Sequence, residues 1–343
     1  MKIQIIYLVI VLLKFERIYY EKEVLNYEQG RRILDMYNDI KKIEIKSHNN
    51  IEELRKYENK YFVKLKRYLV LGIRKTHKYI KNYKVSNYLV PYTSSGCVAM
   101  CMYCYLVCHY NKCAYLRIFV NREEMLDKLI KKAINSEKEE VYEIGSNSDL
   151  VLENMITHNL EWTIEKFAKI NKGYITFPTK FSNIDSLLNL NHAGRVIIRM
   201  SVNPEYIIKN VEFLTSNLKA RVEAINKLVK AKYKVGIIIA PVILVKNYKQ
   251  LYKELIIYLK ENLSDEAKEN LFFEVIFMTY SYVHNMINNE AFPNAIKLYS
   301  KSKMKSRGRY KYSYKDEILL PAKEYIKSIL QEYFPENEIK YIS

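Results

Sequence analysis

Three cysteines in one short loop are the residues of this chain best suited to carry chemistry. Cys97, Cys101 and Cys104 follow the spacing Cys-x3-Cys-x2-Cys. Three thiolates can hold three irons of a [4Fe–4S] cluster and leave the fourth iron open to a ligand from outside the protein. With this spacing the expected outside ligand is S-adenosylmethionine (SAM), whose reductive cleavage starts radical chemistry. The loop therefore predicts a [4Fe–4S] cluster and SAM as cofactors.

A zinc site is the alternative interpretation of the same loop. Cys108, His109 or Cys113 could supply a fourth zinc ligand, although the sequence holds no second Cys-x2-Cys knuckle of the kind that zinc sites usually pair. All five cysteines lie between Cys97 and Cys113. This clustering is typical of a metal site in a reducing compartment and not of a disulfide framework, so we expect a cytoplasmic protein.

Composition sets the size of the protein and suggests a partner. The 343 residues, 49% of them hydrophobic, suffice for one large α/β domain with an appended segment, or for two domains. The net charge of +18 favours a polyanionic partner, first of all nucleic acid. A bias towards Lys, Ile, Asn and Tyr throughout the chain is the other explanation of the charge.

The apolar run at residues 1–14 is too short to span a bilayer and lacks a cleavage site, so we expect a strand or an upstream extension there.

Strands and helices alternate after residue 85, whereas residues 15–85 show no clear periodic pattern. We expect strands at residues 88–93, 141–144, 174–177, 196–201, 235–240 and 271–277. We expect helices at 155–170, 218–231, 248–261 and 320–333, and a further helix that Asn121 caps and that runs to Ile134. Such alternation predicts an α/β fold with a parallel sheet and right-handed crossovers. Six strands favour a partial (β/α)6 TIM barrel over a closed eight-stranded one.

Three parts follow from this pattern. Residues 1–85 form an N-terminal segment, and residues 86–290 form the partial barrel. Residues 291–343 form a C-terminal DNA-contacting segment, a hairpin within a basic and aromatic stretch, followed by the final helix.

Polar residues gather directly after the predicted strands. They are Ser148 and Asp149 after one strand, Lys180 after the next, and Ser201 and Asn203 after a third, with Ala240 and Pro241 ending a fourth. In parallel barrels the active site lies at this carboxyl edge of the sheet. Ordinary loop composition would explain each residue singly, but their recurrence beside the cysteine loop predicts a site.

Several stretches, spread from Ile18 to Ser343, make the chain similar to one family. They include Gly96-Cys97, Cys104-Tyr105-Leu106, Tyr115 to Asn121, Ser148-Asp149, Thr179-Lys180-Phe181, Ser201-Val202-Asn203, Tyr206 to Asn210, Ile239-Ala240-Pro241 and Gly308-Arg309-Tyr310. On these residues the chain resembles spore photoproduct lyase, a family of radical SAM enzymes that repair thymine dimers in spore DNA.

The resemblance implies a role for each matching residue. Cys97, Cys101 and Cys104 would hold the cluster, and Ser148, Lys180, Ser201 and Ala240 would contact SAM. Tyr103 and Tyr105 would relay a radical back to SAM, and Arg309, Tyr310 and Lys311 would contact the lesion in DNA. The chemistry of these side chains agrees, because Lys180 can pair with the SAM carboxylate and aromatic and cationic residues suit a flipped base and its phosphates.

The chain departs from the family pattern in three places. Ser146 stands where the family has a catalytic cysteine, which gives a hydrogen atom to the thymine radical at the end of repair. Phe277, Met278 and Thr279 replace polar and cationic residues after a strand. The segment at residues 308–314 is shorter than the family's hairpin. The radical-generating half of the pattern is therefore kept, while the substrate half has changed.

The resemblance implies a carbon–carbon lyase that reverts the spore thymine dimer to two thymines through a 5′-deoxyadenosyl radical. It implies as partners double-stranded DNA carrying the dimer and an electron donor such as flavodoxin or ferredoxin, with no membrane, in the cytoplasm of the spore core. Two alternatives stay open: a divergent radical SAM enzyme acting on another substrate, and a DNA-binding relative without turnover. Cleavage of SAM without substrate separates the two enzymes from the DNA-binding protein.

Overall fold

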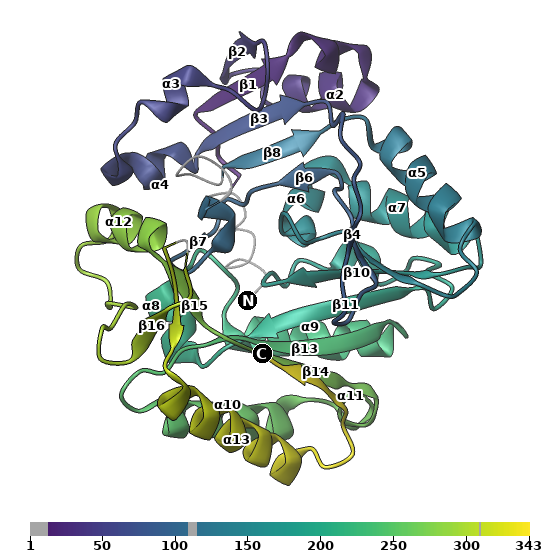
Figure 1. Ribbon diagram of the computed structural model, residues 1–343. Helices are drawn as coiled ribbons and strands as arrows, with labels where there is room; N and C mark the ends of the chain where they lie inside the picture. The colour runs from purple at the N-terminus through teal and green to yellow at the C-terminus, as the bar shows by residue number, and fades with distance from the viewer. Residues whose placement is uncertain (1–12, 109–114, 309) are drawn as a thin grey trace.

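The computed structural model describes residues 13–108, 115–308 and 310–343, so the apolar residues 1–12, His109, Cys113 and Arg309 lie outside the described part. Figure 1 shows two curved sheets, with the N-terminal sheet above the main one. The main sheet has eight strands in the order β18-β14-β13-β11-β10-β9-β5-β4 and is an open half-barrel. The predicted partial barrel is confirmed.

The six predicted strands are confirmed as neighbours in the main sheet, and each pairs in parallel with the next. They are β5 (Tyr88–Leu89), β9 (Val141–Glu143), β10 (Tyr174–Thr179), β11 (Val196–Val202), β13 (Lys234–Val242) and β14 (Phe272–Phe277). β18 (Ile339–Ile342) adds a parallel strand at one edge, and β4 (Ile80–Lys81) pairs antiparallel with β5 at the other. The central strands are almost continuously buried, as expected where helices cover one face and a core fills the other.

Three strands from residues 15–85 form, together with two strands from later in the chain, a second sheet that the sequence pattern did not predict. It has the order β2-β1-β3-β8-β6 and consists of β1 (Arg17–Glu21), β2 (Lys41–Ile45), β3 (Tyr68–Gly72), β6 (Ser94–Ser95) and β8 (Leu116–Phe119). β3 is buried along its whole length and pairs with β8, which comes from the middle of the chain. Short elements surround this sheet: η1 (Lys22–Asn26), α2 (Glu28–Met36), α3 (Glu52–Arg55), η2 (Asn59–Tyr61) and α4 (Phe62–Leu65).

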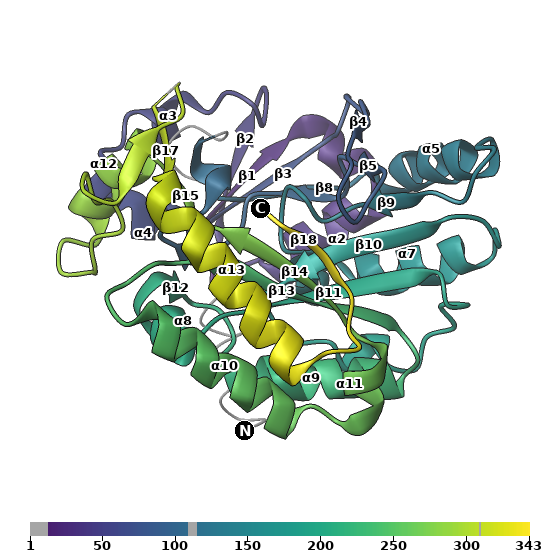
Figure 2. The ribbon, with the colours of Figure 1, turned by 60° about the horizontal axis from the view of Figure 1, so that its bottom comes forward.

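Most predicted helices are confirmed within a few residues. They are α5 (Arg122–Ile134), α9 (Leu218–Lys230), α10 (Tyr248–Asn262) and α13 (Asp316–Tyr333), joined by the shorter η4 (Asp185–Leu187), α8 (Glu205–Val211) and α11 (Asp265–Asn270). Figure 2 shows α9, α10, α11 and α13 along the outer side of the main sheet. Asn121 precedes α5 as predicted but does not cap it, because its side chain accepts from the Arg74 amide (2.9 Å) and donates to the Arg74 carbonyl (3.0 Å).

The single helix predicted at residues 155–170 is wrong, because two helices replace it. α6 (Leu150–Thr157) and α7 (Asn159–Ala168) meet at His158, whose φ of 53° is left-handed. At this break, side-chain oxygens accept hydrogen bonds from backbone amides that have no partner within the helix. Asn154 Oδ1 accepts from the Leu160 amide (2.7 Å), and Thr157 Oγ1 accepts from the Asn159 amide (3.2 Å).

The C-terminal hairpin and helix are also confirmed. β16 (Met304–Ser306) and β17 (Lys311–Tyr314) form the hairpin, and β17 also pairs with β15 (Thr279–Ser281). α12 (Tyr282–Ala291) follows β15 directly. Among the described residues no helix is both long and apolar enough to cross a membrane.

A buried ion network joins strands across the inner face of the main sheet. Arg199 on β11 pairs with Glu143 on β9 (2.6 Å) and with Glu274 on β14 (3.2 Å). Tyr341 on β18 donates to Glu274 (2.7 Å). Four strands are thus fixed relative to one another, and the positions at their carboxyl ends are fixed with them.

Candidate active site

The cysteine loop is held through its backbone by distant parts of the chain. Three side chains donate to its carbonyl groups: Lys66 Nζ to Cys97 (2.7 Å), Asn288 Nδ2 to Met102 (2.7 Å) and His284 Nε2 to Cys104 (3.0 Å). Lys66 follows α4 in the N-terminal segment, whereas the other two donors lie on α12. The loop therefore takes its shape from contacts that lie far from it in the sequence.

The same loop also forms a small strand pair. β7 (Met100–Cys101) pairs antiparallel with β12 (Glu212–Phe213), so that Cys101 lies opposite Glu212. The Met102 amide donates to the Val211 carbonyl (3.0 Å). This pairing brings the cysteines against the segment that follows α8.

The three thiols lie in a largely buried environment. Cys97 is buried, and Cys101 and Cys104 are half-buried. Burial raises the pKa of the Cys97 thiol to about 12, with the Asp149 carboxylate adding to the shift. Burial likewise raises the pKa of Cys101 well above its usual range, followed by the charge of Glu212. The charges of neighbouring thiolates raise these pKa values further. A bound metal would supply the positive charge that stabilises thiolates in this buried loop.

A [4Fe–4S] cluster and a single zinc ion place different demands on the cysteines. Within the described residues, no three metal-ligating side chains converge on one point. A zinc ion requires all its sulfur ligands at about 2.3 Å from one centre, whereas each cysteine of a cluster binds its own iron. A [4Fe–4S] cluster on this loop would take one thiolate from each of Cys97, Cys101 and Cys104.

Lys180 brings together three of the four residues predicted to contact SAM. Its ammonium donates to Ser201 Oγ (2.5 Å) and to the Ala240 carbonyl (3.0 Å). It also pairs with Glu212 Oε1 at 3.3 Å. Lys180, Ser201 and Ala240 come from the carboxyl ends of β10, β11 and β13, which is the edge where the sequence pattern predicted a site.

Ser148, the fourth predicted SAM residue, carries a buried hydroxyl that makes no hydrogen bond within the described residues. Its backbone forms a bridge with Gly96, and the neighbouring Asn147 carbonyl accepts from the Gly96 amide (2.8 Å). Asp149 links this turn to β10 by accepting from Thr179 Oγ1 (2.8 Å) and from the Lys180 amide (2.9 Å). A buried hydroxyl without a partner costs free energy, so the site fits a ligand that supplies one.

Glu212 is a site residue that the sequence analysis missed. It is fully buried and accepts from Tyr103 Oη, from Asn203 Nδ2 (2.9 Å) and from Arg221 (2.7 Å). Burial alone would raise the pKa of this carboxyl, but the charges of Lys180 and Arg221 outweigh it and lower the pKa to about 2. Nothing in its surrounding residue pattern marks Glu212, because its partners come from four separate segments.

Replacing this carboxylate is expected to destabilise the protein. Glu212→Gln leaves the buried Arg221 guanidinium and the Lys180 ammonium without their counter-charge, and removing one partner of a buried pair costs about 3–5 kcal/mol. Urea denaturation of both proteins measures the difference. Glu205→Gln is the control: it breaks an exposed pair with Lys209 worth at most about 1 kcal/mol, while the oxygen of the new amide can still accept from the Leu218 amide as Glu205 does (3.0 Å). Equal midpoints for Glu212→Gln and Glu205→Gln would contradict the expectation.

Ser146 lies in the turn between β9 and α6, two residues before Ser148, and is half-buried. Gly145 lets this turn approach β10 closely, because a Cβ atom there would lie 2.7 Å from the Cβ of Phe177.

The two tyrosines of the cysteine loop differ in their surroundings. Tyr103 is held by Glu212, whereas Tyr105 on η3 (Tyr105–Cys108) is 52% exposed.

The remaining predicted residues lie further along the chain. Tyr310 at the tip of the hairpin is 76% exposed with a left-handed φ of 60°, and Lys311 beside it begins β17 and is exposed. Cys108, a candidate zinc ligand, instead contacts Ser281 Oγ (3.2 Å) and His284 Nε2 (3.6 Å). Phe277 and Met278, where the chain departs from the family pattern, are buried at the end of β14.

A comparison with models of protein families shows which family the chain belongs to. The family model described as spore photoproduct lyase matches residues 13–343. The chain belongs to the spore photoproduct lyase family. It is therefore a lyase of the radical SAM type.

Individual members of the family align with this chain over nearly their whole length. The chain is 31% identical to spore photoproduct lyase of Bacillus subtilis over 95% of this chain and 97% of the relative. It is 33% identical to the enzyme of Clostridium acetobutylicum over 96% of this chain and 98% of the relative. A solved spore photoproduct lyase complexed with dinucleoside spore photoproduct matches with a TM-score of 0.89 and 28% identity, covering 97% of this chain and 100% of the other. A doubly substituted variant with bound AdoMet and dinucleoside spore photoproduct also has a TM-score of 0.89, at 27% identity and the same coverage.

Proposed function

We propose that this chain reverts the spore thymine dimer in DNA to two thymines, using a [4Fe–4S] cluster on Cys97, Cys101 and Cys104 together with SAM. The observation that carries the proposal is the junction at Lys180, where Ser201, Ala240 and Glu212 meet beside the cysteine loop. Solved relatives of the same fold are titled as complexes with AdoMet and with dinucleoside spore photoproduct.

The chain's own residues bind and orient the reactants. A cluster held by Cys97, Cys101 and Cys104, with SAM bound beside it, would supply the 5′-deoxyadenosyl radical needed to take a hydrogen atom from the lesion. Lys180 attracts the carboxylate of SAM, and the unpaired hydroxyl of Ser148 bonds one of its polar groups. The buried surroundings exclude water, which would otherwise intercept a radical. Tyr103 and Tyr105 serve as the relay that returns the radical to SAM.

The partners follow from the charge and from the hairpin. Arg309, Tyr310 and Lys311 contact the lesion in double-stranded DNA, since an exposed aromatic ring between cations suits a base taken out of the helix. An electron donor such as flavodoxin or ferredoxin would supply the electron that the cluster needs. The hydrogen atom that completes the second thymine has to come from elsewhere than a thiol at position 146, where this chain has serine.

The test is anaerobic reconstitution followed by product analysis with dinucleoside spore photoproduct and SAM. We expect the dinucleoside to be converted to thymidine, with 5′-deoxyadenosine accumulating only in turnovers in which the radical is not returned to SAM. SAM cleavage without thymine would instead support an enzyme for another substrate, a candidate that Ser146 and the buried apolar residues Phe277 and Met278 favour. DNA binding without any SAM cleavage would leave a DNA-binding relative that lacks turnover.

A further inference from the structure

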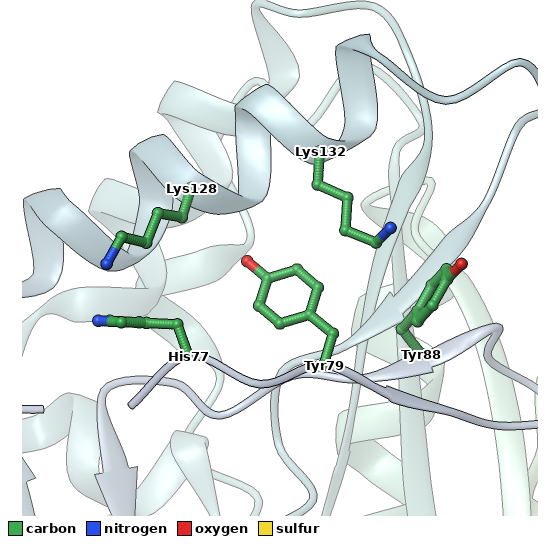
Figure 3. A pocket seen from close by; sticks show the side chains of 5 residues that line it. All are labelled: His77, Tyr79, Tyr88, Lys128 and Lys132. Atoms are coloured by element: carbon green, nitrogen blue, oxygen red, sulfur yellow. The ribbon is translucent and has the colours of Figure 1, made fainter. Parts of the chain in front are cut away.

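An open pocket lies at the edge of the main sheet, away from the residues of the candidate active site. Its volume is about 370 Å³, and it is lined by His77, Tyr79, Tyr88, Lys128 and Lys132. Figure 3 shows both lysines reaching down from α5, with the hydroxyl of Tyr79 pointing up between them. His77 lies below Lys128, and Tyr88 lies beside Lys132. The pocket is thus walled by α5 on one side and by the segment leading into the β4–β5 hairpin on the other.

The two lysines carry positive charge, which Glu124, one turn before Lys128 on α5, offsets in part. Lys128 and Lys132 are one turn apart on α5, and no carboxylate of the described residues lies within 4.0 Å of either ammonium. The Lys132 ammonium lies 4.2 Å from the centre of the Tyr88 ring, a contact that leaves its charge in place. Like charges at this spacing on a helix repel each other, and a bound anion would relieve that repulsion.

The positive field of the pocket also acts on His77. Burial lowers the pKa of this histidine, and the charges of Lys128 and Arg74 lower it further. His77 is therefore neutral at pH 7 and can donate one N–H bond, while burial raises the pKa of Tyr79 to about 12 and keeps its hydroxyl a donor. The pocket thus offers two ammonium groups, a phenol and an imidazole, which together suit an anionic oxygen ligand.

The basic surface continues beyond the pocket along the chain. Residues 75–84 contain four exposed lysines and no acidic residue: Lys75, Lys78, Lys81 and Lys84. The hairpin that this segment enters exposes Tyr83, which is 88% accessible to solvent. A single small anion would need only the pocket, whereas an extended run of cations beside an exposed aromatic ring fits a long polyanion with bases.

We propose that the pocket formed by Lys128, Lys132, His77 and Tyr79 binds the phosphodiester backbone of a DNA strand that flanks the lesion. This inference rests on the proposed function, because it takes DNA as the partner. The contacts are to phosphate oxygens, so they position the duplex without reading its sequence. The site therefore increases the affinity for long DNA. It does not change the affinity for a substrate that ends at the lesion.

The double variant Lys128→Gln/Lys132→Gln tests the site against the charge-matched control Lys219→Gln/Lys230→Gln. The control lysines are exposed on α9, on the outer side of the main sheet, and the control loses the same two charges. Binding of an undamaged duplex is measured by fluorescence anisotropy across a salt series. Two lost phosphate contacts reduce the slope of log K against log salt by about 1.8. The control retains the slope of the unchanged protein.

A second measurement separates this inference from the proposed function. Turnover of dinucleoside spore photoproduct by the pocket variant should equal that of the unchanged protein, while its KM for the lesion within a long duplex should rise. Failure of the unchanged protein to convert the dinucleoside would refute the proposed function and leave the binding result to be judged on its own. Equal salt slopes for the pocket variant and the control would overturn the pocket assignment.

Discussion

Alanine at Cys97, Cys101 or Cys104 is expected to abolish SAM cleavage, the largest effect of any single substitution in this chain. Each thiolate of a three-cysteine cluster binds a different iron, so the loss of one leaves an iron without its protein ligand. Iron and sulfide analysis after anaerobic reconstitution, followed by an assay for 5′-deoxyadenosine, measures the outcome.

Cys108→Ala is the matched control within the same loop. Its thiol contacts Ser281 and His284 rather than the other cysteines, so its removal should leave about four irons and four sulfides bound. The unchanged protein's reduced EPR signal should change when SAM is added. Tight zinc binding with no cluster after reconstitution, or a loss of SAM cleavage in Cys108→Ala equal to that in Cys97→Ala, would contradict the assignment of the ligands.

The main sheet could be predicted from the sequence because its signals are local. Each of its central strands is a short apolar run between helices of clear periodicity, and residues such as Lys180 and Ser201 follow those runs directly. Parallel pairing then places the ends of the strands at one edge. The meeting of Lys180 with Ser201 and Ala240 follows from that topology once the strands are known.

The N-terminal sheet could not be predicted, because its stability comes from distant partners. β1 and β2 are short strands rich in Lys and Tyr, and β3 is completed by β8 from beyond the cysteine loop. The same reason hid Glu212, whose partners Tyr103, Arg221 and Lys180 lie far from it or on other elements. The break at His158 escaped because the apolar spacing runs through it, while the polar side chains that stop α6 act only in three dimensions.

Ser146 raises a chemical problem that the rest of the site does not solve. In the proposed reaction, one thymine is left as a radical that needs a hydrogen atom after the bridge of the dimer breaks. The O–H bond of serine is much stronger than the S–H bond of cysteine, so Ser146 cannot donate its hydrogen readily. Among the described residues, Tyr103, Tyr105 and Cys108 carry weaker X–H bonds, but Tyr103 is bound to Glu212 and Cys108 lies beside His284. We therefore expect slow turnover by the unchanged protein. Part of the thymine radical should be trapped by external reductants or oxidants and appear as modified thymine.

Ser146→Cys is expected to raise the yield of unmodified thymine, because it supplies a weak S–H bond at the position where the family has one. The two side chains differ by a single atom and the turn is already shaped by Gly145, so the fold should tolerate the change. Ser146→Ala is the control, since it removes the hydroxyl without adding a thiol and should not improve the yield. Chromatography with mass analysis of the products, using SAM deuterated at the 5′ carbon, reports both thymine and the source of its hydrogen. Clean repair by the unchanged protein with no gain in Ser146→Cys would mean that hydrogen returns by another route. If Ser146→Cys cleaves SAM and still leaves the lesion untouched, the thymine dimer is not the substrate, and a different molecule must be sought for this site.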